Sequence, residues 1–241
     1  MKFIERLAAR SRDTRAERPV LIACLGDSVT HGCFELTVDD QDKFEPVYHI
    51  EWGYVHKLGA RLRQLFPAAV PTVLNAGISG DGSAGGLERL DRDVLAFKPD
   101  LVTVNFGLND SMSGESGIPQ YAANMRAIFE KILATGAEAM LVTPSFMCSY
   151  VPPMVEGNRL RAIAADAAKI QNSGVLARYA DAARAEAEKL GVPVADTFRR
   201  WEQLKAAGVD TTALLSNGIN HPTAEMHDLF VEEIMRKAFE A

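Results

Sequence analysis

The chain has 241 residues, of which 47% are hydrophobic and 24% are charged, and its formal net charge is -6. This composition disfavours disordered and fibrous classes of protein, and the acidic balance argues against nucleic-acid binding. The length suits one large domain with a substantial core.

Two features of the chain bear on its compartment. The basic start MKFIERLAARSRDTRAERP has no long apolar run, so it does not resemble a secretory signal, and no segment reaches the roughly 20 apolar residues of a membrane span. Cys24, Cys33 and Cys148 are an odd number of cysteines, which favours free thiols in a reducing compartment. We therefore predict a cytoplasmic protein without a membrane span. The sequence leaves the oligomeric state open.

The predicted secondary structure alternates along the chain. Short apolar runs, typical of strands buried on both faces of a parallel sheet, cover residues 19–25, 72–74, 101–104, 139–142 and 192–195. Helical periodicity covers residues 53–66, 84–97, 120–135, 159–190 and 223–240. This alternation predicts an α/β fold with a parallel sheet of about five strands and helices on both sides. Thr223 is the expected N-cap of the last helix.

Residues 31–52 do not fit this alternation. The stretch HGCFELTVDDQDKFEPVYHIEW mixes acids with aromatics and is longer than a usual connection, so we predict a long substrate-side loop or insertion. Its aromatic side chains either wall a substrate pocket or only cover the first helix; they are Phe34, Phe44, Tyr48 and Trp52. Residues 144–158 form a second candidate wall, stiffened by two adjacent prolines.

Small polar residues follow the predicted strands. Ser28 lies in GDS after the first strand, Gly77 in NAG after the second, and Asn109 in GLND after the third, while His221 precedes the last helix. The carboxyl ends of parallel strands meet at one rim, where open sheets bind ligands. A serine, a histidine base and nearby donors are what acyl transfer requires. Asp110, next to Asn109, is expected to cap backbone N–H groups instead of acting as an acid.

These four segments, in this order, resemble the four blocks of the SGNH (GDSL-type) hydrolases, and they extend over residues 26–222. The resemblance implies one domain over residues 1–241 with a flavodoxin-like three-layer α/β/α fold, and an esterase or lipase that needs no metal or cofactor. It implies Ser28 as nucleophile and His221 as general base and acid. The oxyanion donors would be the Ser28 and Gly77 N–H groups and the Asn109 side chain.

The substrate implied by the resemblance is a small-molecule ester, because most such enzymes act on carboxylic esters. Small acyl groups such as acetyl on a carbohydrate are expected first, since the family often deacetylates carbohydrates. A lysophospholipid or a thioester is the alternative. Two other readings stay open: a degenerate hydrolase kept for interaction, and a non-catalytic flavodoxin-like module that binds a nucleotide or flavin. The phosphate cradle of such a module would be GISGDGSAGG at 77–86, which lacks a P-loop lysine.

The sequence departs from the family's pattern near the histidine. Most members have an aspartate three residues before it, and here that position is Gly218. If one residue is inserted, Asn217 takes the place of the aspartate, and its carbonyl could accept a hydrogen bond from the imidazole. Asp210, a backbone carbonyl or no group at all are the alternatives. We favour a Ser-His dyad aided by Asn217 or a backbone carbonyl.

Overall fold

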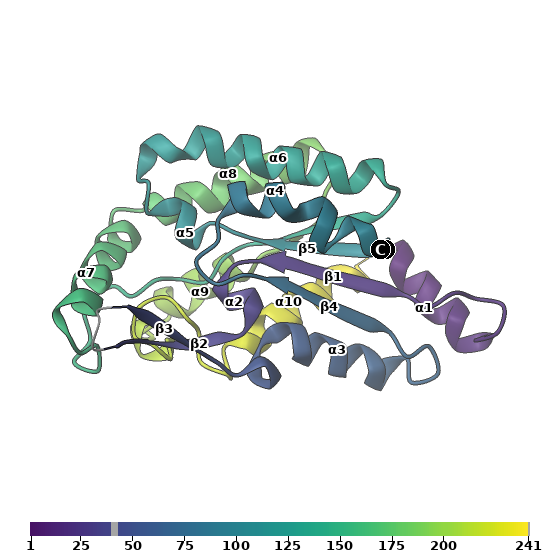
Figure 1. Cartoon of the computed structure of the whole chain (residues 1–241), viewed down its shortest axis with the longest axis horizontal. Helices are drawn as coiled ribbons and strands as arrows, with labels where there is room; N and C mark the ends of the chain where they lie inside the picture. The colour runs from purple at the N-terminus through teal and green to yellow at the C-terminus, as the bar shows by residue number, and fades with distance from the viewer. Residues whose placement is uncertain (40–42, 241) are drawn as a thin grey trace.

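The structure is a computed structural model that describes residues 1–39 and 43–240. Its main sheet has five parallel strands in the order β4-β1-β5-β6-β7 (Figure 1), namely β1 (Leu21–Gly26), β4 (Thr72–Gly77), β5 (Leu101–Asn105), β6 (Glu138–Val142) and β7 (Val194–Ala195). Counted within the sheet this order is 2-1-3-4-5, the flavodoxin-like arrangement. The predicted fold class is confirmed.

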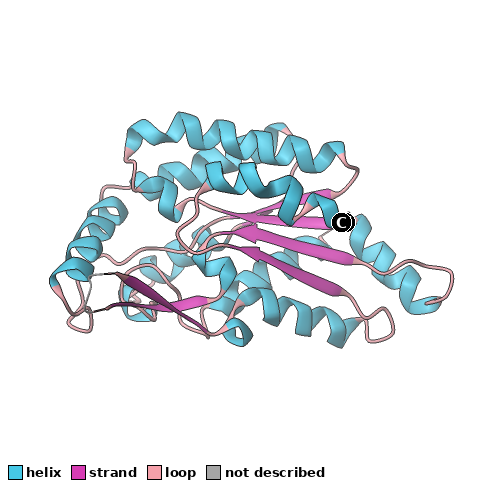
Figure 2. Ribbon diagram, in the orientation of Figure 1, coloured by secondary structure: helices cyan, strands magenta, loops and turns pink. Residues whose placement is uncertain are grey.

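Helices cover both faces of this sheet (Figures 1 and 2). One face carries α4 (Ser83–Asp93), α6 (Ile118–Ala134) and α8 (Val175–Lys189); the other carries α1 (Lys2–Arg12), α3 (Tyr54–Leu65), α9 (Thr197–Ala206) and α10 (His227–Phe239). Side chains along β1 alternate between the two hydrophobic clusters: Ile22 and Cys24 join one, while Ala23 and Leu25 join the other. A strand buried on both faces needs apolar residues at every position, which is why this strand reads as a continuous apolar run.

Several predicted boundaries differ from the structure. The predicted helix over 159–190 is two helices, α7 (Asn158–Asn172) and α8, separated at Gly174, whose φ of 75° belongs to the left-handed region. Thr223 is not the cap of the last helix, because α10 begins at His227 and the Thr223 carbonyl accepts the His227 N–H. The sequence patterns did not predict α1 or α9.

Residues 31–52, predicted as a long substrate-side loop or insertion, are not an irregular loop. They contain an antiparallel hairpin of β2 (Cys33–Val38) and β3 (Phe44–Tyr48), followed by one 3-10 turn at Ile50–Trp52. The hairpin extends from the main sheet toward α7 (Figure 1). Residues 40–42 of this segment lie outside the described residues.

All three cysteines are buried and free, as the odd count suggests. No helix within residues 1–39 and 43–240 is long and apolar enough to cross a membrane.

Candidate functional site

The first strand delivers Ser28 to the rim of the sheet. β1 ends at Gly26, the Asp27 carboxylate accepts the Val29 N–H at 3.0 Å, and the short helix α2 (Ser28–His31) begins at the serine. A Cβ on Gly26 would lie 2.1 Å from the Thr30 hydroxyl oxygen, so this tight turn requires glycine. Ser28 is buried there, with 6% of its surface exposed.

A compact turn before α10 delivers His221 to the same place. The Asn217 side-chain oxygen accepts the backbone N–H groups of Ile219, Asn220 and His221, each at 3.0 Å. The Ser216 N–H donates to the His221 carbonyl at 2.7 Å. This turn aims the imidazole at the serine, and His221 Nε2 lies 2.9 Å from Ser28 Oγ, although 193 positions separate the two residues.

Within residues 1–39 and 43–240, the other ring nitrogen of His221 has no carboxylate partner. Its Nδ1 is buried and makes no hydrogen bond with the described residues. Asn217 uses its oxygen on backbone N–H groups, and Asp210 is exposed and accepts the Tyr150 hydroxyl at 2.7 Å. Both side chains were candidates to orient the ring, and the structure contradicts both. Burial lowers the pKa of His221 to about 4. The Phe34 backbone carbonyl acts in the opposite direction and raises this pKa.

The lowered pKa predicts how activity depends on pH, if His221 acts as a base. Only the neutral ring accepts a proton, and a group with a lowered pKa stays neutral down to lower pH. The acid limb of kcat/KM should therefore be half-maximal at a pH of about 4, well below the ordinary histidine value of 6.5. The measurement is kcat/KM for an aryl acetate between pH 3.5 and 8, with circular dichroism at each pH to confirm that the protein is folded.

Asp27 supplies the control for this pH profile. Burial raises the pKa of Asp27 to about 7, helped by the charges of Asp110 and Asp81. Asp27→Asn keeps an oxygen that can accept the Val29 N–H and removes the titration. An acid limb near pH 6.5 that persists in Asp27→Asn would contradict the prediction for His221.

The serine and histidine open into a cavity of about 380 Å³. Its apolar walls come from the β2–β3 hairpin, from α7 and from the turn before His221. The lining residues are Ser28, Cys33, Leu36, Phe44, Pro46, Ser79, Gly80, Asn109, Ile163, Ile219, Asn220 and His221.

Among the predicted aromatic wall residues, Phe44 lines this cavity, whereas Phe34 is buried, with its ring tilted against His227 and edge-on to Trp52. Tyr48 and Trp52 are exposed outside it. Residues 144–158 do not line the cavity, and Ile163 of α7 takes the place of that second wall. The hairpin and α7 therefore form the walls beside Ser28.

Two predicted donors occupy different environments. Asn109, in the short helix α5 (Leu108–Ser111), lines the cavity, and its Nδ2 donates to the Asp81 carbonyl at 2.7 Å, which leaves its second N–H for another acceptor. Gly77 does not line the cavity. Its N–H already donates to the Asn75 side-chain oxygen at 2.9 Å, and a Cβ there would lie 2.2 Å from the His31 nitrogen. The prediction of Gly77 as an oxyanion donor is therefore wrong.

Gly80, three residues further on, lines the cavity in its place. Its φ is +81°, and no hydrogen bond within the described part of the chain uses its N–H. The Ser28 N–H is likewise without an acceptor there. Sequence reasoning missed Gly80, although it lies in the same NAGISGDG stretch that drew attention to Gly77.

Asp110 has the structural role that the sequence suggests. Its carboxylate accepts the Ser83 N–H at 2.9 Å and the Ser83 hydroxyl at 2.6 Å, at the start of α4. Burial raises its pKa, although the hydrogen bonds from Ser83 oppose the shift. Asp110 thus stabilises the beginning of α4 and makes no contact with His221 among the described hydrogen bonds.

Comparison with curated proteins finds partial matches to esterases. The chain is 38% identical over 84 residues to Esterase TesA of Pseudomonas aeruginosa, covering 35% of this chain and 41% of that protein. It is 33% identical over 86 residues to Acetylxylan esterase of Geobacillus stearothermophilus, covering 36% and 37%. The Uncharacterized lipoprotein YqeF of Bacillus subtilis is 27% identical over 169 residues, covering 63% and 65%. The chain thus spans less than two thirds of each of these relatives.

Solved structures share the fold over most of the chain. Axe2, an acetylxylan esterase from Geobacillus stearothermophilus, superposes with a TM-score of 0.66 at 19% identity, covering 92% of this chain and 95% of that one. A two-domain esterase active on acetylated mannans has a TM-score of 0.67 at 19% identity, covering 98% and 52%. The sequence model of the GDSL-like Lipase/Acylhydrolase family matches residues 24–229. This chain is therefore a member of the GDSL-like lipase/acylhydrolase family.

Proposed function

We propose that the protein is a serine esterase that hydrolyses carboxylic esters through an acyl-Ser28 intermediate. The observation that carries the proposal is the 2.9 Å hydrogen bond between His221 Nε2 and Ser28 Oγ at the edge of a cavity whose Ser28 and Gly80 N–H groups have no acceptor among the described residues. A serine hydroxyl is a weak nucleophile unless an adjacent base removes its proton. His221 lies within hydrogen-bond reach to act as that base, and its lowered pKa keeps the ring neutral, and so able to accept a proton, at physiological pH.

The chemistry follows from the groups around the serine. Ser28 Oγ attacks the ester carbonyl and transfers its proton to His221 Nε2, and the carbonyl oxygen becomes an oxyanion. The Ser28 N–H, the Gly80 N–H and the Asn109 amide would donate hydrogen bonds to that oxyanion. When the tetrahedral intermediate collapses, His221 returns the proton to the departing alkoxide, which leaves as an alcohol. Water then attacks the acyl-serine by the reverse route and releases the carboxylic acid.

His221 would perform these proton transfers as part of a dyad. Because no carboxylate of the described residues contacts Nδ1, the imidazolium that forms during each step lacks the adjacent negative charge that a triad supplies. The Phe34 backbone carbonyl, which raises the pKa of the ring against the effect of burial, supports the protonated form in part. The histidine of such a dyad is a weaker base than the histidine of a full triad. Because it stays neutral to a lower pH, the dyad stays active in mild acid.

The proposed substrates carry short acyl groups such as acetyl on a carbohydrate. The cavity of about 380 Å³ is lined on its apolar side by Leu36, Phe44 and Ile163, and its modest volume favours short acyl chains. Relatives of the chain that are named as acetylxylan esterases support the choice of a sugar ester.

A panel of esters tests this proposal. We expect the highest kcat/KM for p-nitrophenyl acetate, a fall of about tenfold or more at an eight-carbon acyl group, and release of acetate from acetylated xylo-oligosaccharides. Ser28→Ala, assayed beside the wild type, corrects for spontaneous hydrolysis. If kcat/KM instead rises with chain length, or if only thioesters react, the lysophospholipase or thioesterase alternative takes its place.

The non-catalytic alternative is disfavoured by the start of α4. A phosphate bound by GISGDGSAGG would need free N–H groups there. The Asp110 carboxylate already occupies the Ser83 N–H and hydroxyl, and its negative charge would repel a phosphate.

We further propose a reducing compartment such as the cytoplasm. The argument is the buried and unpaired state of Cys24, Cys33 and Cys148, since oxidising compartments favour disulfides.

A further inference from the structure

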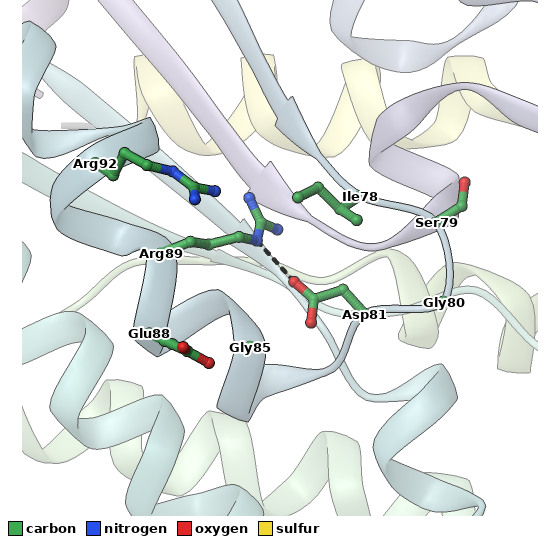
Figure 3. A pocket seen from close by; sticks show the side chains of 8 residues that line it. All are labelled: Ile78, Ser79, Gly80, Asp81, Gly85, Glu88, Arg89 and Arg92. Atoms are coloured by element: carbon green, nitrogen blue, oxygen red, sulfur yellow. Dashed lines mark hydrogen bonds and ion pairs between the residues drawn. The ribbon is translucent and has the colours of Figure 1, made fainter.

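One buried arginine connects the segments that carry the proposed oxyanion donors. Arg89 lies on α4, and its side chain is 7% exposed (Figure 3). It lines a second cavity of about 540 Å³ that shares Ser79 and Gly80 with the cavity beside Ser28. Arg89 does not line the Ser28 cavity itself, so any effect it has on the reaction passes through other residues.

The guanidinium binds the carboxyl ends of two neighbouring strands. Arg89 Nη2 donates to the Gly26 carbonyl at 2.9 Å, two residues before Ser28, and Nη1 donates to the Ala76 carbonyl at 2.7 Å. These contacts join the turn that carries the nucleophile to the strand that precedes the Gly80 loop. A planar fork of five donors can satisfy several acceptors at once, whereas a lysine ammonium cannot reproduce this geometry.

The same guanidinium also binds the Gly80 loop. Arg89 Nε donates to Asp81 Oδ2 at 2.7 Å, the contact drawn as a dashed line in Figure 3. Asp81 follows Gly80 directly, and its backbone carbonyl accepts the Asn109 amide at 2.7 Å. Asp81 therefore couples the guanidinium to two of the three proposed donors.

Gly80 depends on these neighbours for its position. A Cβ built on Gly80 would meet no atom within 4 Å, so the residue itself is not held by packing. The loop is fixed on one side by Asp81 and on the other by Ser79, whose N–H and hydroxyl lie 3.3 and 3.4 Å from His31 Nδ1. The direction of the Gly80 N–H is thus set by anchors outside the residue.

We propose that Arg89 is a positioning residue that holds the Ser28, Gly80 and Asn109 donors in one geometry for the oxyanion. This inference rests on the proposed esterase function. The donors act on the charge that develops in the transition state, so their misplacement lowers kcat more than it changes KM. Displacing catalytic groups by about 1 Å can slow a reaction by about 100-fold.

The test is a steady-state comparison of Arg89→Ala and Arg89→Lys with the wild type on p-nitrophenyl acetate. We expect kcat to fall about 10- to 100-fold in Arg89→Ala, with KM within about twofold and a partial loss in Arg89→Lys. Guanidinium ion at low millimolar concentration should restore part of the kcat of Arg89→Ala, because it fits the space the side chain leaves. The matched control is Arg92→Ala, which removes an exposed arginine of the same helix that pairs with Asp93 and should show neither the loss nor the rescue.

Asp81→Asn provides a second variant should Arg89→Ala fail to fold. It keeps the backbone carbonyl that binds Asn109 and removes the charge that Arg89 contacts, and a fall in kcat at constant KM is expected there too. Three results would overturn the proposal. The first is a folded Arg89 variant that keeps the wild-type kcat, and the second is a change in KM alone. The third is a loss of activity in proportion to the fraction of protein that is unfolded, with no rescue by guanidinium. Wild-type activity and phosphonate labelling of Ser28 are measured in parallel. If the wild type shows neither activity nor labelling, the esterase function is refuted. If the wild type shows both and the kcat of the Arg89 variant is unchanged, only the role of Arg89 is refuted.

Discussion

Replacing Ser28 by alanine should lower kcat/KM for ester hydrolysis by about 10⁴-fold or more, and His221→Ala should do nearly the same. In the proposed mechanism the two side chains form one proton-transfer unit through their 2.9 Å hydrogen bond, so removing either one would remove the activated nucleophile. The double variant should therefore be little worse than each single variant. The measurements are kcat/KM for p-nitrophenyl acetate and the labelling of Ser28 by a fluorophosphonate, located by mass spectrometry.

The control for this experiment is Ser116→Ala, which removes an exposed serine whose hydroxyl donates to the Ser113 carbonyl. It should keep the wild-type kcat/KM. Melting temperatures of all variants show whether a loss of activity comes from unfolding. Full activity in a folded Ser28→Ala protein, or losses at Ser28 and His221 that multiply in the double variant, would contradict the dyad.

The parallel sheet was predictable because its strands are buried on both faces. In β5, Val102 and Val104 belong to one hydrophobic cluster and Leu101 to the other, which produces the continuous apolar run that marks such strands. Ser28 and Asn109 were proposed as site residues by the same logic, since each follows one of those runs. His221 was proposed from its place before the last helix, which packs back on the sheet, and the resemblance to a family strengthened that proposal, because the turn between Leu215 and the last helix has no periodicity to interpret.

Gly77 was mistaken for a donor because the end of its strand cannot be read from hydrophobicity. The apolar run stops at Leu74, yet β4 continues through Asn75 to Gly77, where Gly77 pairs with Gly26 of β1. Pairing with a neighbouring strand, and not local propensity, extends it. The rim of the sheet therefore begins further along the chain, and Gly80 occupies the place expected for Gly77.

The β2–β3 hairpin was also not predicted, because hydrophobicity alone does not mark its strands. Its strands are partly exposed, and Pro46 lies within β3. A proline cannot donate to a strand ladder and lowers the expectation of a strand from sequence. The hairpin nevertheless forms, and it supplies Leu36, Phe44 and Pro46 to the cavity.

The structure explains why glycine stands where the family usually has aspartate. Gly218 has a φ of +66°, and a Cβ there would lie 2.8 Å from Pro152 Cγ. An aspartate would be strained in this left-handed conformation and would also clash with the proline ring. The backbone of the turn is organised instead by Asn217, whose oxygen accepts three N–H groups. The local backbone thus disfavours a carboxylate at position 218.

Replacing Asn109 by alanine should lower kcat by about 100- to 1,000-fold while leaving KM within about threefold. The Asn109 amide is the one side-chain donor among the three proposed for the oxyanion, and its contribution increases as negative charge develops on the substrate oxygen. Asn109→Asp should be at least as slow, because it puts a carboxylate where the oxyanion forms. The measurements are kcat and KM for p-nitrophenyl acetate and the rate of Ser28 phosphonylation.

Asn172→Ala is the matched control for Asn109. Asn172 is exposed, and its Nδ2 donates to the Ser149 carbonyl at 2.8 Å, much as Asn109 donates to the Asp81 carbonyl at 2.7 Å. Losing such a hydrogen bond lowers stability by about 1 kcal/mol, so both variants should lose similar stability while only Asn109→Ala loses kcat. If kcat falls equally in both variants, or if Asn109→Ala raises KM at constant kcat, Asn109 does not serve the oxyanion. Since Asp81 binds both Asn109 and Arg89, the losses at these two positions should also be less than multiplicative when combined.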